Sequence, residues 1–245
     1  MWLRGRETRA SQRFGACGRP AQYAARRGCP HGALPYSLLR APGSSQGAPQ
    51  RMSRAVFLDR DGVLNAYLPG DYAKTPDELL LLPGVGAIVQ KLRAAGYLTI
   101  LISNQQGVAK GLMTPADLAA VTAKLRAEVP LDALYYCPHL KSEDCACRKP
   151  KPGMLLQAAQ EHAIDLSASV FIGDTPTDAQ AALAAGVPFV LVLTGQTKDP
   201  AGFSPTPNAV AQTLSEAVEW VLGSPRLERG VNEPRASSAK AAHEG

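Results

Sequence analysis

Two carboxylates one residue apart follow an apolar segment, and their spacing indicates a site that could do chemistry. Val56–Leu58 leads directly into Asp59 and Asp61, and Gly62 then lets the chain turn. A buried strand that ends in two acids is costly unless a cation or a reactive group lies there. Asp59 could attack a phosphoryl group as a nucleophile, and Asp61 could serve as general acid and later as general base. Because the two acids would repel, we expect a divalent cation, and an oxygen-only site suits Mg²⁺.

Two further apolar segments also end in polar residues. Leu98–Ser103 predicts a second buried strand, and the Ser103 hydroxyl could donate a hydrogen bond to a phosphate oxygen. Val170–Ile172 predicts a third strand, after which Asp174 could ligate the metal. Asp178 follows four residues later and could brace either that metal or a lysine. Parallel strands bring their carboxyl ends to one edge of a sheet, so these side chains are expected to converge.

A basic cluster precedes one of the expected helices. Arg148, Lys149 and Lys151 stand just before Gly153, and Pro152 is expected at the first helical position. One of the lysines could neutralise negative charge that develops in a transition state. Taken singly, each of these polar groups has an ordinary structural explanation, as a turn, a solvated face or a helix cap. Their order along the chain, each at the end of a strand, argues instead for a single site.

Together, these four segments resemble the four motifs of the haloacid dehalogenase-like superfamily of aspartate-nucleophile phosphatases. The resemblance implies that Asp59 is the nucleophile and Asp61 the acid/base. It implies that Ser103 and Lys149 stabilise the phosphate, since Lys149 fits the Lys-Pro-x-Pro pattern better than the second lysine of the cluster does. It also implies Mg²⁺ bound by Asp59, Asp174 and the Asp61 backbone carbonyl. The expected fold is α/β, a three-layer, doubly wound parallel sheet of the Rossmann-like kind.

A second group of residues has the spacing of a metal site, Cys-x-His-x5-Cys-x-Cys. Its members are Cys137, His139, Cys145 and Cys147. Three thiolates and one imidazole make a closed tetrahedral set, which is typical of structural zinc. So short and polar a loop cannot bury enough apolar surface to order itself, and metal binding would supply the free energy. The alternatives are a reduced cysteine cluster without metal and a disulfide.

The position of this loop directly before Arg148 narrows the resemblance to two groups. One is the D-glycero-D-manno-heptose 1,7-bisphosphate phosphatases, and the other is the histidinol-phosphatase domains of histidine biosynthesis. The segment 104–111 is similar to the heptose group's Asn-Gln-x-Gly-(Ile/Val)-Ala-(Arg/Lys)-Gly, whereas the five-residue gap inside the Cys/His cluster is as short as in the histidinol group. The resemblance implies that Asn104, Gln105 and Arg148 contact the substrate. Arg148 would bind the part that is not cleaved, because a guanidinium suits a second phosphate.

We therefore expect a magnesium-dependent phosphomonoesterase that removes the C7 phosphate of the heptose bisphosphate through a phosphoaspartyl intermediate at Asp59. The alternatives are a histidinol-phosphate phosphatase, a polynucleotide 3′-phosphatase and, from another class, a zinc-stabilised binding module with an inactive site. The complete set of acids and the retained lysine argue against the last. The expected partner is a small phosphorylated sugar, with neither membrane nor nucleic acid involved. The protein is expected to be a cytoplasmic monomer.

Composition separates one folded region from two ends. Residues 1–51 contain nine arginines, no lysine and one acid, Glu7, which gives a net charge of +8. The remaining chain has 17 basic and 20 acidic residues, or −3. We expect 1–51 to be a disordered basic extension before a true start at Met52; a transit-like arm and a nucleic-acid-binding tail are the other interpretations. The phosphatase domain is expected over 52–223 and a disordered tail over 224–245.

Strands and helices are expected to alternate through the folded region, which predicts a parallel sheet with helices on both faces. No insertion between the motifs is long enough for a large cap domain, so a minimal cap is expected. Nor does the chain contain an apolar run of about 18 residues that could span a membrane. After the first strand, helices are expected at 84–96, 115–128, 153–163, 177–185 and 214–222. Strands are expected at 98–103, 133–137, 169–173 and 188–193.

Overall fold

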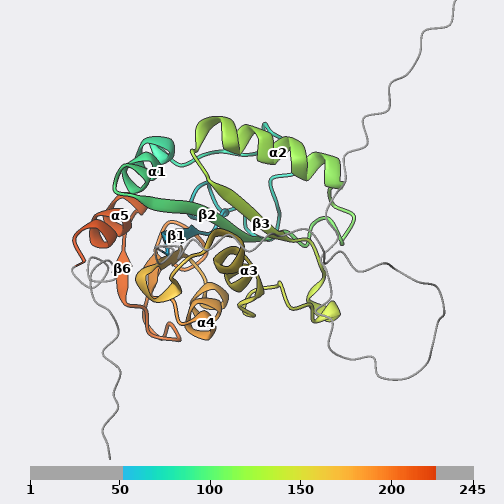
Figure 1. Cartoon of the computed structure of the whole chain (residues 1–245). Helices are drawn as coiled ribbons and strands as arrows, with labels where there is room; N and C mark the ends of the chain where they lie inside the picture. Colours follow the sequence, from blue (N-terminus) through green and yellow to red (C-terminus); the bar gives the residue numbers. More distant parts are fainter. Residues whose placement is uncertain (1–51, 225–245) are drawn as a thin grey trace, which may run out of the picture. The chain divides into compact units, whose positions relative to one another are not determined.

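The computed structural model describes residues 52–224, which are built around a six-stranded parallel sheet (Figure 1). The spatial order of the strands is β3-β2-β1-β4-β5-β6. This order reverses direction between β1 and β4, and doubly wound sheets hold their ligands at such a point, beyond the carboxyl ends of the strands. The strands are β1 Arg54–Leu58, β2 Tyr97–Asn104, β3 Ala133–Cys137, β4 Val170–Gly173, β5 Phe189–Val192 and β6 Ala209–Ala211.

Helices cover both faces of the sheet, as the sequence predicts. α1, α2 and α5 lie over one face, while α3 and α4 lie over the other, which gives three layers (Figure 1). The helices are α1 Val85–Ala94, α2 Pro115–Glu128, α3 Gly153–His162, α4 Pro176–Ala185 and α5 Leu214–Leu222. Within 52–224, no helix combines the length and the apolarity that crossing a bilayer requires. The predicted extension 1–51, and all of the predicted tail except its first residue, lie outside the described residues.

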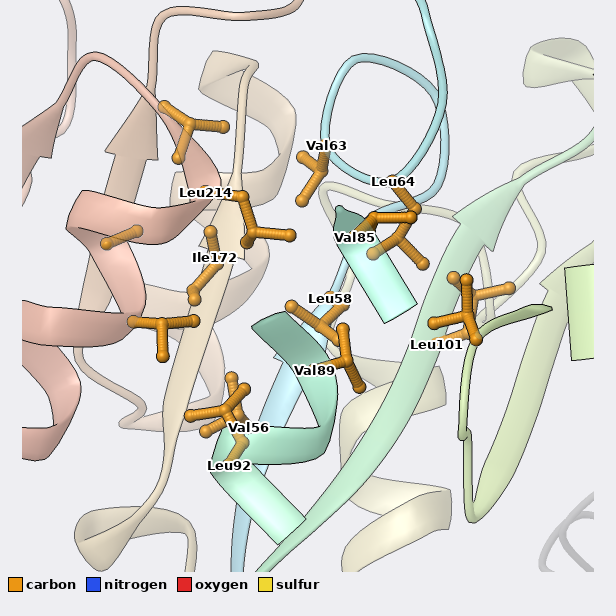
Figure 2. Packing of buried hydrophobic residues seen from close by; sticks show 14 of the residues in the cluster. Val56, Leu58, Val63, Leu64, Val85, Val89, Leu92, Leu101, Ile172 and Leu214 are labelled. Carbon is orange, nitrogen blue, oxygen red and sulfur yellow. The ribbon is translucent and has the colours of Figure 1, made fainter. Parts of the chain in front are cut away.

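Strand β1 lies between two apolar clusters and contributes to both. Successive side chains of a strand point to opposite faces. Val56 and Leu58 therefore pack with the helix α1 on one face (Figure 2), whereas Phe57 packs in the cluster beneath α3 and α4. All three side chains are fully buried. A strand held from both faces gives the residue that follows it, Asp59, a fixed position.

The expected helices and strands are all present, and the bounds predicted for α2, β3 and α5 are those observed. Pro152 is a correction: it is the N-cap of α3 rather than its first residue, because its ψ of 5° lies outside the helical range and the helix begins at Gly153. Three short elements were not predicted. They are β6 and the 3₁₀ helices Lys141–Glu143 and Leu166–Ala168. Three residues are too few to show an alternating or helical pattern.

Helix α2 begins with a reciprocal cap that offers a test of local stability. The Thr114 hydroxyl accepts the N–H of Asp117 at 3.1 Å, and the Asp117 carboxylate accepts the N–H of Thr114 at 2.8 Å. We expect Thr114→Ala to lower the free energy of unfolding by about 1 kcal/mol, because a helix N–H loses its acceptor. Thr114→Ser keeps the oxygen and should lose much less. Urea denaturation followed by circular dichroism measures both, and equal losses would contradict this account of the cap.

Candidate active site

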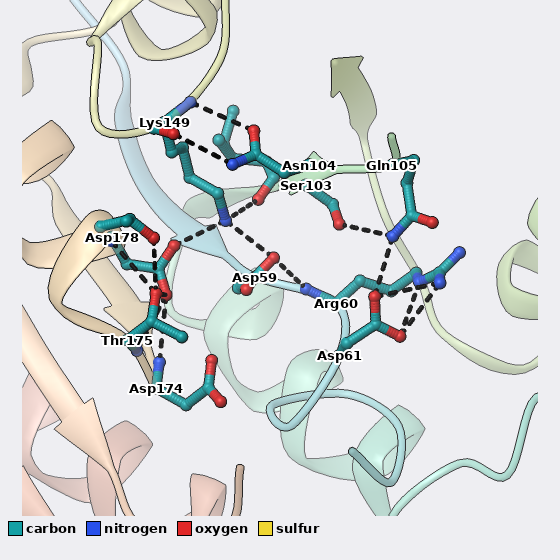
Figure 3. Close-up of polar contacts among 12 residues, drawn as sticks. Asp59, Arg60, Asp61, Ser103, Asn104, Gln105, Lys149, Asp174, Thr175 and Asp178 are labelled. Atoms are coloured by element: carbon teal, nitrogen blue, oxygen red, sulfur yellow. Dashed lines mark hydrogen bonds and ion pairs between the residues drawn. The ribbon is translucent and has the colours of Figure 1, made fainter. Parts of the chain in front are cut away.

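The predicted catalytic residues meet at the carboxyl ends of three neighbouring strands. Asp59 directly follows β1, Asp174 directly follows β4, and Ser103 lies near the end of β2. Figure 3 shows these side chains around one space, into which Lys149 reaches from the segment before α3. The pocket is lined by Asp59, Asp61, Tyr67, Ser103, Asn104, Lys149, Asp174, Thr175, Thr177, Asp178 and Gln196.

Lys149 is the buried cation of the pocket, with only 3% of its surface exposed. Its Nζ lies 2.9 Å from Asp59 Oδ1 and 2.6 Å from Asp178 Oδ1, and it donates a hydrogen bond to Ile102 O at 3.0 Å. These three contacts match the three donors of an ammonium group. Burial favours the neutral amine, but the charges of Asp178 and Asp59 outweigh it and raise the pKa of Lys149. Asp178 thus contacts the lysine. This is one of the two roles predicted from the sequence, the other being support of the metal.

The carboxylates of Asp59 and Asp174 lie close enough to share one cation, with ligand oxygens within 4.8 Å of each other. Burial and the charge of Asp178 raise the pKa of Asp59 to about 7, although Lys149 opposes the shift. Burial and the charges of Asp178 and Asp59 raise the pKa of Asp174 to about 8. In addition, Asp174 Oδ1 is buried and accepts no hydrogen bond from the described residues. Burial and mutual repulsion make the ionised form of these carboxylates unfavourable, and a bound divalent cation would offset that cost. Oxygen ligands of this kind suit Mg²⁺.

Asp178 lies within the same distance of these two carboxylates. Its oxygens are already used, since Oδ1 pairs with Lys149 while Oδ2 accepts the hydroxyl of Thr175 at 2.7 Å and its N–H at 3.1 Å. Asp178 is therefore a poorer ligand than Asp59 or Asp174. Sequence reasoning instead names the Asp61 backbone carbonyl as the third protein ligand, and that assignment stays a prediction.

Asp61 lines the pocket and is held by side chains that lie behind it. Both carboxylate oxygens accept hydrogen bonds from the Arg60 guanidinium, whose Nη2 is 3.0 Å from each. Asn65 Nδ2 donates to Oδ1 at 3.0 Å, and Gln105 Nε2 donates to Oδ2 at 2.8 Å. Arg60 is fully buried, whereas a quarter of the Asp61 side chain is exposed. Sequence reasoning overlooked Arg60 and Asn65, because an arginine between two acids usually indicates an exposed turn.

The predicted substrate-binding residues differ in where they lie. Asn104 lines the pocket, but its amide also exchanges two hydrogen bonds of 3.1 Å with the backbone of Lys149. Gln105 is fully buried and does not line the pocket. Arg148 also lies outside the lining, with Nη1 donating to the backbone oxygen of His139 at 3.3 Å. Contact of these residues with a substrate stays a prediction, while their contacts with the protein are observed.

The Cys/His loop brings its four side chains together as a cluster. The Sγ atoms of Cys137 and Cys145 lie 3.5 Å apart, and those of Cys145 and Cys147 lie 3.4 Å apart. His139 Nδ1 lies 3.7 Å from Cys137 Sγ and 3.2 Å from Cys147 Sγ. With Zn–S bonds of about 2.3 Å, the edges of a tetrahedral site are about 3.8 Å, so the cluster is close to the size that zinc requires. The described cysteines are all free thiols.

Two glycines pack against Asp174: Gly62, which the sequence indicates only as a turn residue, and Gly195, which the sequence reasoning did not single out. A Cβ on Gly195 would lie 1.9 Å from Asp174 Oδ2, and a Cβ on Gly62 would lie 2.6 Å from the same atom. The next residue, Gln196, donates its N–H to Asp174 Oδ2 at 2.5 Å. The sequence did carry a signal, because Thr194, Gly195 and Gln196 follow β5 just as the recognised motifs follow their strands.

A strand order that reverses beside paired carboxylates and a buried lysine defines a hydrolase of the haloacid dehalogenase-like class. Residues 146–217 match the model of the family described as HAD-hydrolase-like. The chain is 36% identical over 177 residues to the D-glycero-beta-D-manno-heptose-1,7-bisphosphate 7-phosphatase of Helicobacter pylori, covering 69% of this chain and 97% of that protein. The Pseudomonas putida enzyme of that name is 42% identical over 148 residues, covering 58% and 84%. The chain belongs to the D-glycero-beta-D-manno-heptose-1,7-bisphosphate 7-phosphatase family.

A solved structure of the same family resembles the fold described above. It is the D,D-heptose 1,7-bisphosphate phosphatase of Bordetella bronchiseptica, complexed with magnesium and phosphate. The two chains are 35% identical with a TM-score of 0.64, and the match covers 69% of this chain and 98% of the other.

The close packing at Gly195 allows a test of the Asp174 site. We expect Gly195→Ala to displace the Asp174 carboxylate and to raise the Mg²⁺ concentration for half-maximal activity on the order of tenfold, as changes beside a metal ligand do. Gly223→Ala is the matched control, because the nearest atom to its added carbon is Glu219 O at 3.3 Å. Magnesium titrations of phosphate release compare the variants. An unchanged magnesium requirement in Gly195→Ala would contradict the assignment of Asp174.

Proposed function

We propose that this protein removes the C7 phosphate from D-glycero-β-D-manno-heptose 1,7-bisphosphate. The observation that carries the proposal is the meeting of Asp59, Asp174 and Lys149 at the strand ends, in a chain of this family. The relatives compared above are named for the β anomer, which favours that anomer here. The alternatives, histidinol phosphate and a polynucleotide 3′-phosphate, have no such support.

The first step transfers the phosphoryl group to Asp59. Oδ1 of this carboxylate is held by Lys149 and by the N–H of Arg60 at 2.7 Å, so Oδ2 is the oxygen positioned for attack. As the new Oδ2–P bond forms, the bond between phosphorus and the C7 oxygen breaks. Asp61, in its protonated form, gives its proton to the departing oxygen. Lys149 and the Ser103 hydroxyl offset the negative charge on the phosphoryl oxygens.

The second step releases the phosphate. Water attacks phosphorus, Asp61 takes a proton from that water, and the bond from phosphorus to Asp59 breaks to regenerate the carboxylate. Mg²⁺, bound by Asp59, Asp174 and the Asp61 backbone carbonyl, would neutralise charge on the phosphoryl group in both steps. Arg148 would recognise the phosphate on C1, which is not cleaved.

The Cys/His cluster would hold zinc away from the reaction. Its four ligands leave no position for water or substrate, so the ion would act on structure alone. The cluster would fix Arg148, which donates to the His139 carbonyl, and the adjacent Lys149. We place the enzyme in the cytoplasm, where thiols stay reduced and available to a metal, and we expect it to act as a monomer.

A substrate panel tests the proposed function. Phosphate release is measured with both anomers of the heptose 1,7-bisphosphate, fructose 1,6-bisphosphate and histidinol phosphate. We expect the β anomer to give the highest kcat/KM, and Asp59→Asn to reduce its turnover on the order of 10³-fold or more, because the nucleophile is lost. The variant should keep its zinc. Turnover of histidinol phosphate alone would refute the assigned substrate, and normal turnover by Asp59→Asn would refute the mechanism.

Removal of one zinc ligand tests the structural role of the cluster. We expect Cys145→Ser to lose bound zinc and to lower kcat/KM on the order of tenfold, because Arg148 and Lys149 lose their support. Ser142→Ala is the control, since this exposed residue lies in the same loop outside the cluster. Elemental analysis gives the zinc content, and phosphate release gives the activity. Full activity in a zinc-free Cys145→Ser protein would contradict this role.

A further inference from the structure

Gln105 lies behind the pocket and joins two of its polar side chains. Its amide nitrogen, Nε2, donates to Asp61 Oδ2 at 2.8 Å and to Ser103 Oγ at 3.0 Å. An amide nitrogen carries two hydrogens, so both bonds can form at once. The Gln105 backbone is fixed as well, because its N–H donates to the Cys137 carbonyl at 2.7 Å. The side chain is fully buried and therefore has little freedom to leave this position.

The orientation of the Gln105 amide is set by its neighbours. If the group were turned over, its oxygen would face the carboxylate of Asp61, and two acceptors would oppose each other. With the nitrogen in that place, the hydroxyl of Ser103 receives a hydrogen bond rather than giving one to Gln105. Its own hydrogen can then point toward the pocket that Ser103 lines.

The Asp61 carboxylate is consequently held from two sides. Arg60 and Asn65 bind Oδ1, and Arg60 also reaches Oδ2. Gln105 donates a further hydrogen bond to Oδ2. This donor comes from the segment after β2, whereas Arg60 and Asn65 both come from the segment after β1. The plane of a carboxylate can rotate, and this contact adds a restraint on Oδ2 to those that Arg60 and Asn65 provide.

We propose that Gln105 is a positioning residue that orients Asp61 for proton transfer to the leaving oxygen. The proposal rests on the function proposed above and assigns Gln105 a contact within the protein in place of a contact with substrate. General acid catalysis depends on holding the proton within hydrogen-bond reach of the atom that receives it. Loss of the Gln105 donors should therefore slow reactions that need this proton more than reactions that do not.

The leaving group provides the distinguishing measurement. A sugar alkoxide is a poor leaving group and needs a proton, whereas 4-nitrophenolate leaves readily as an anion. In a reaction through a phosphoaspartyl intermediate, kcat/KM covers the steps up to and including departure of the leaving group. The ratio of kcat/KM for the heptose bisphosphate to that for 4-nitrophenyl phosphate thus isolates the acid step.

The test uses Gln105→Met, which keeps the length of the side chain and removes both donors. We expect kcat/KM for the heptose bisphosphate to fall on the order of 10- to 100-fold and that for 4-nitrophenyl phosphate to fall only a few-fold. Gln106→Met is the matched control, because Gln106 is the neighbouring residue and does not line the pocket. Thermal unfolding of both variants shows whether the fold is retained.

A double-mutant comparison gives a second, independent readout. If Gln105 acts through Asp61, then adding Gln105→Met to Asp61→Asn should lower kcat/KM by no more than about threefold, since the shared step is already lost. Equal losses for both esters, a full additional loss in the double variant, or no loss at all would overturn the proposal. Failure of the unmodified enzyme on the heptose bisphosphate would refute only the proposed substrate, and fructose 1,6-bisphosphate would then serve as the sugar ester in both comparisons.

Discussion

The arrangement of the site depends on one buried ammonium group placed between carboxylates. A buried charge is strongly unfavourable unless it is paired and fully hydrogen-bonded. Lys149 meets this condition through Asp59 after β1, Asp178 in the first turn of α4 and the carbonyl of Ile102 in β2. These three segments therefore cannot separate without leaving a donor of the buried ammonium group without its partner. The same constraint fixes the carboxylate that we assign as nucleophile.

The charges around Lys149 also explain why a cation belongs here. Asp59, Asp174 and Asp178 supply three carboxylates against one ammonium, which leaves two negative charges when all are ionised. Burial and the neighbouring carboxylates raise the pKa of Asp59 to about 7 and that of Asp174 to about 8, which shows that these negative charges oppose one another. A divalent cation would balance the same excess and keep both carboxylates ionised, the state that nucleophilic attack requires.

Much of this molecule could be predicted from local sequence signals, and the rest depends on tertiary contacts. The carboxylates after β1 and the cap at Thr114 each involve residues within a few positions of one another, so their spacing alone indicates the structure. By contrast, Arg60 is fully buried beside Tyr136, which lies 76 residues later in the chain, although a charged residue ordinarily predicts exposure. Gly195 is constrained by Asp174, which lies 21 residues earlier in the chain. No window of neighbouring residues contains that information.

The two carboxylates of the first motif therefore have different main partners, although the charge of Asp61 also contributes to the raised pKa of Asp59. Asp59 shares its environment with Asp174 and Lys149, a group that is complete only with a cation. Asp61 pairs with Arg60 and takes further hydrogen bonds from uncharged amides. Its placement consequently needs no metal. One strand end can thus hold the residue that we propose as nucleophile beside the residue that we propose as acid/base. The geometry of the second is set by protein contacts, because Arg60 turns its guanidinium inward to bind Asp61.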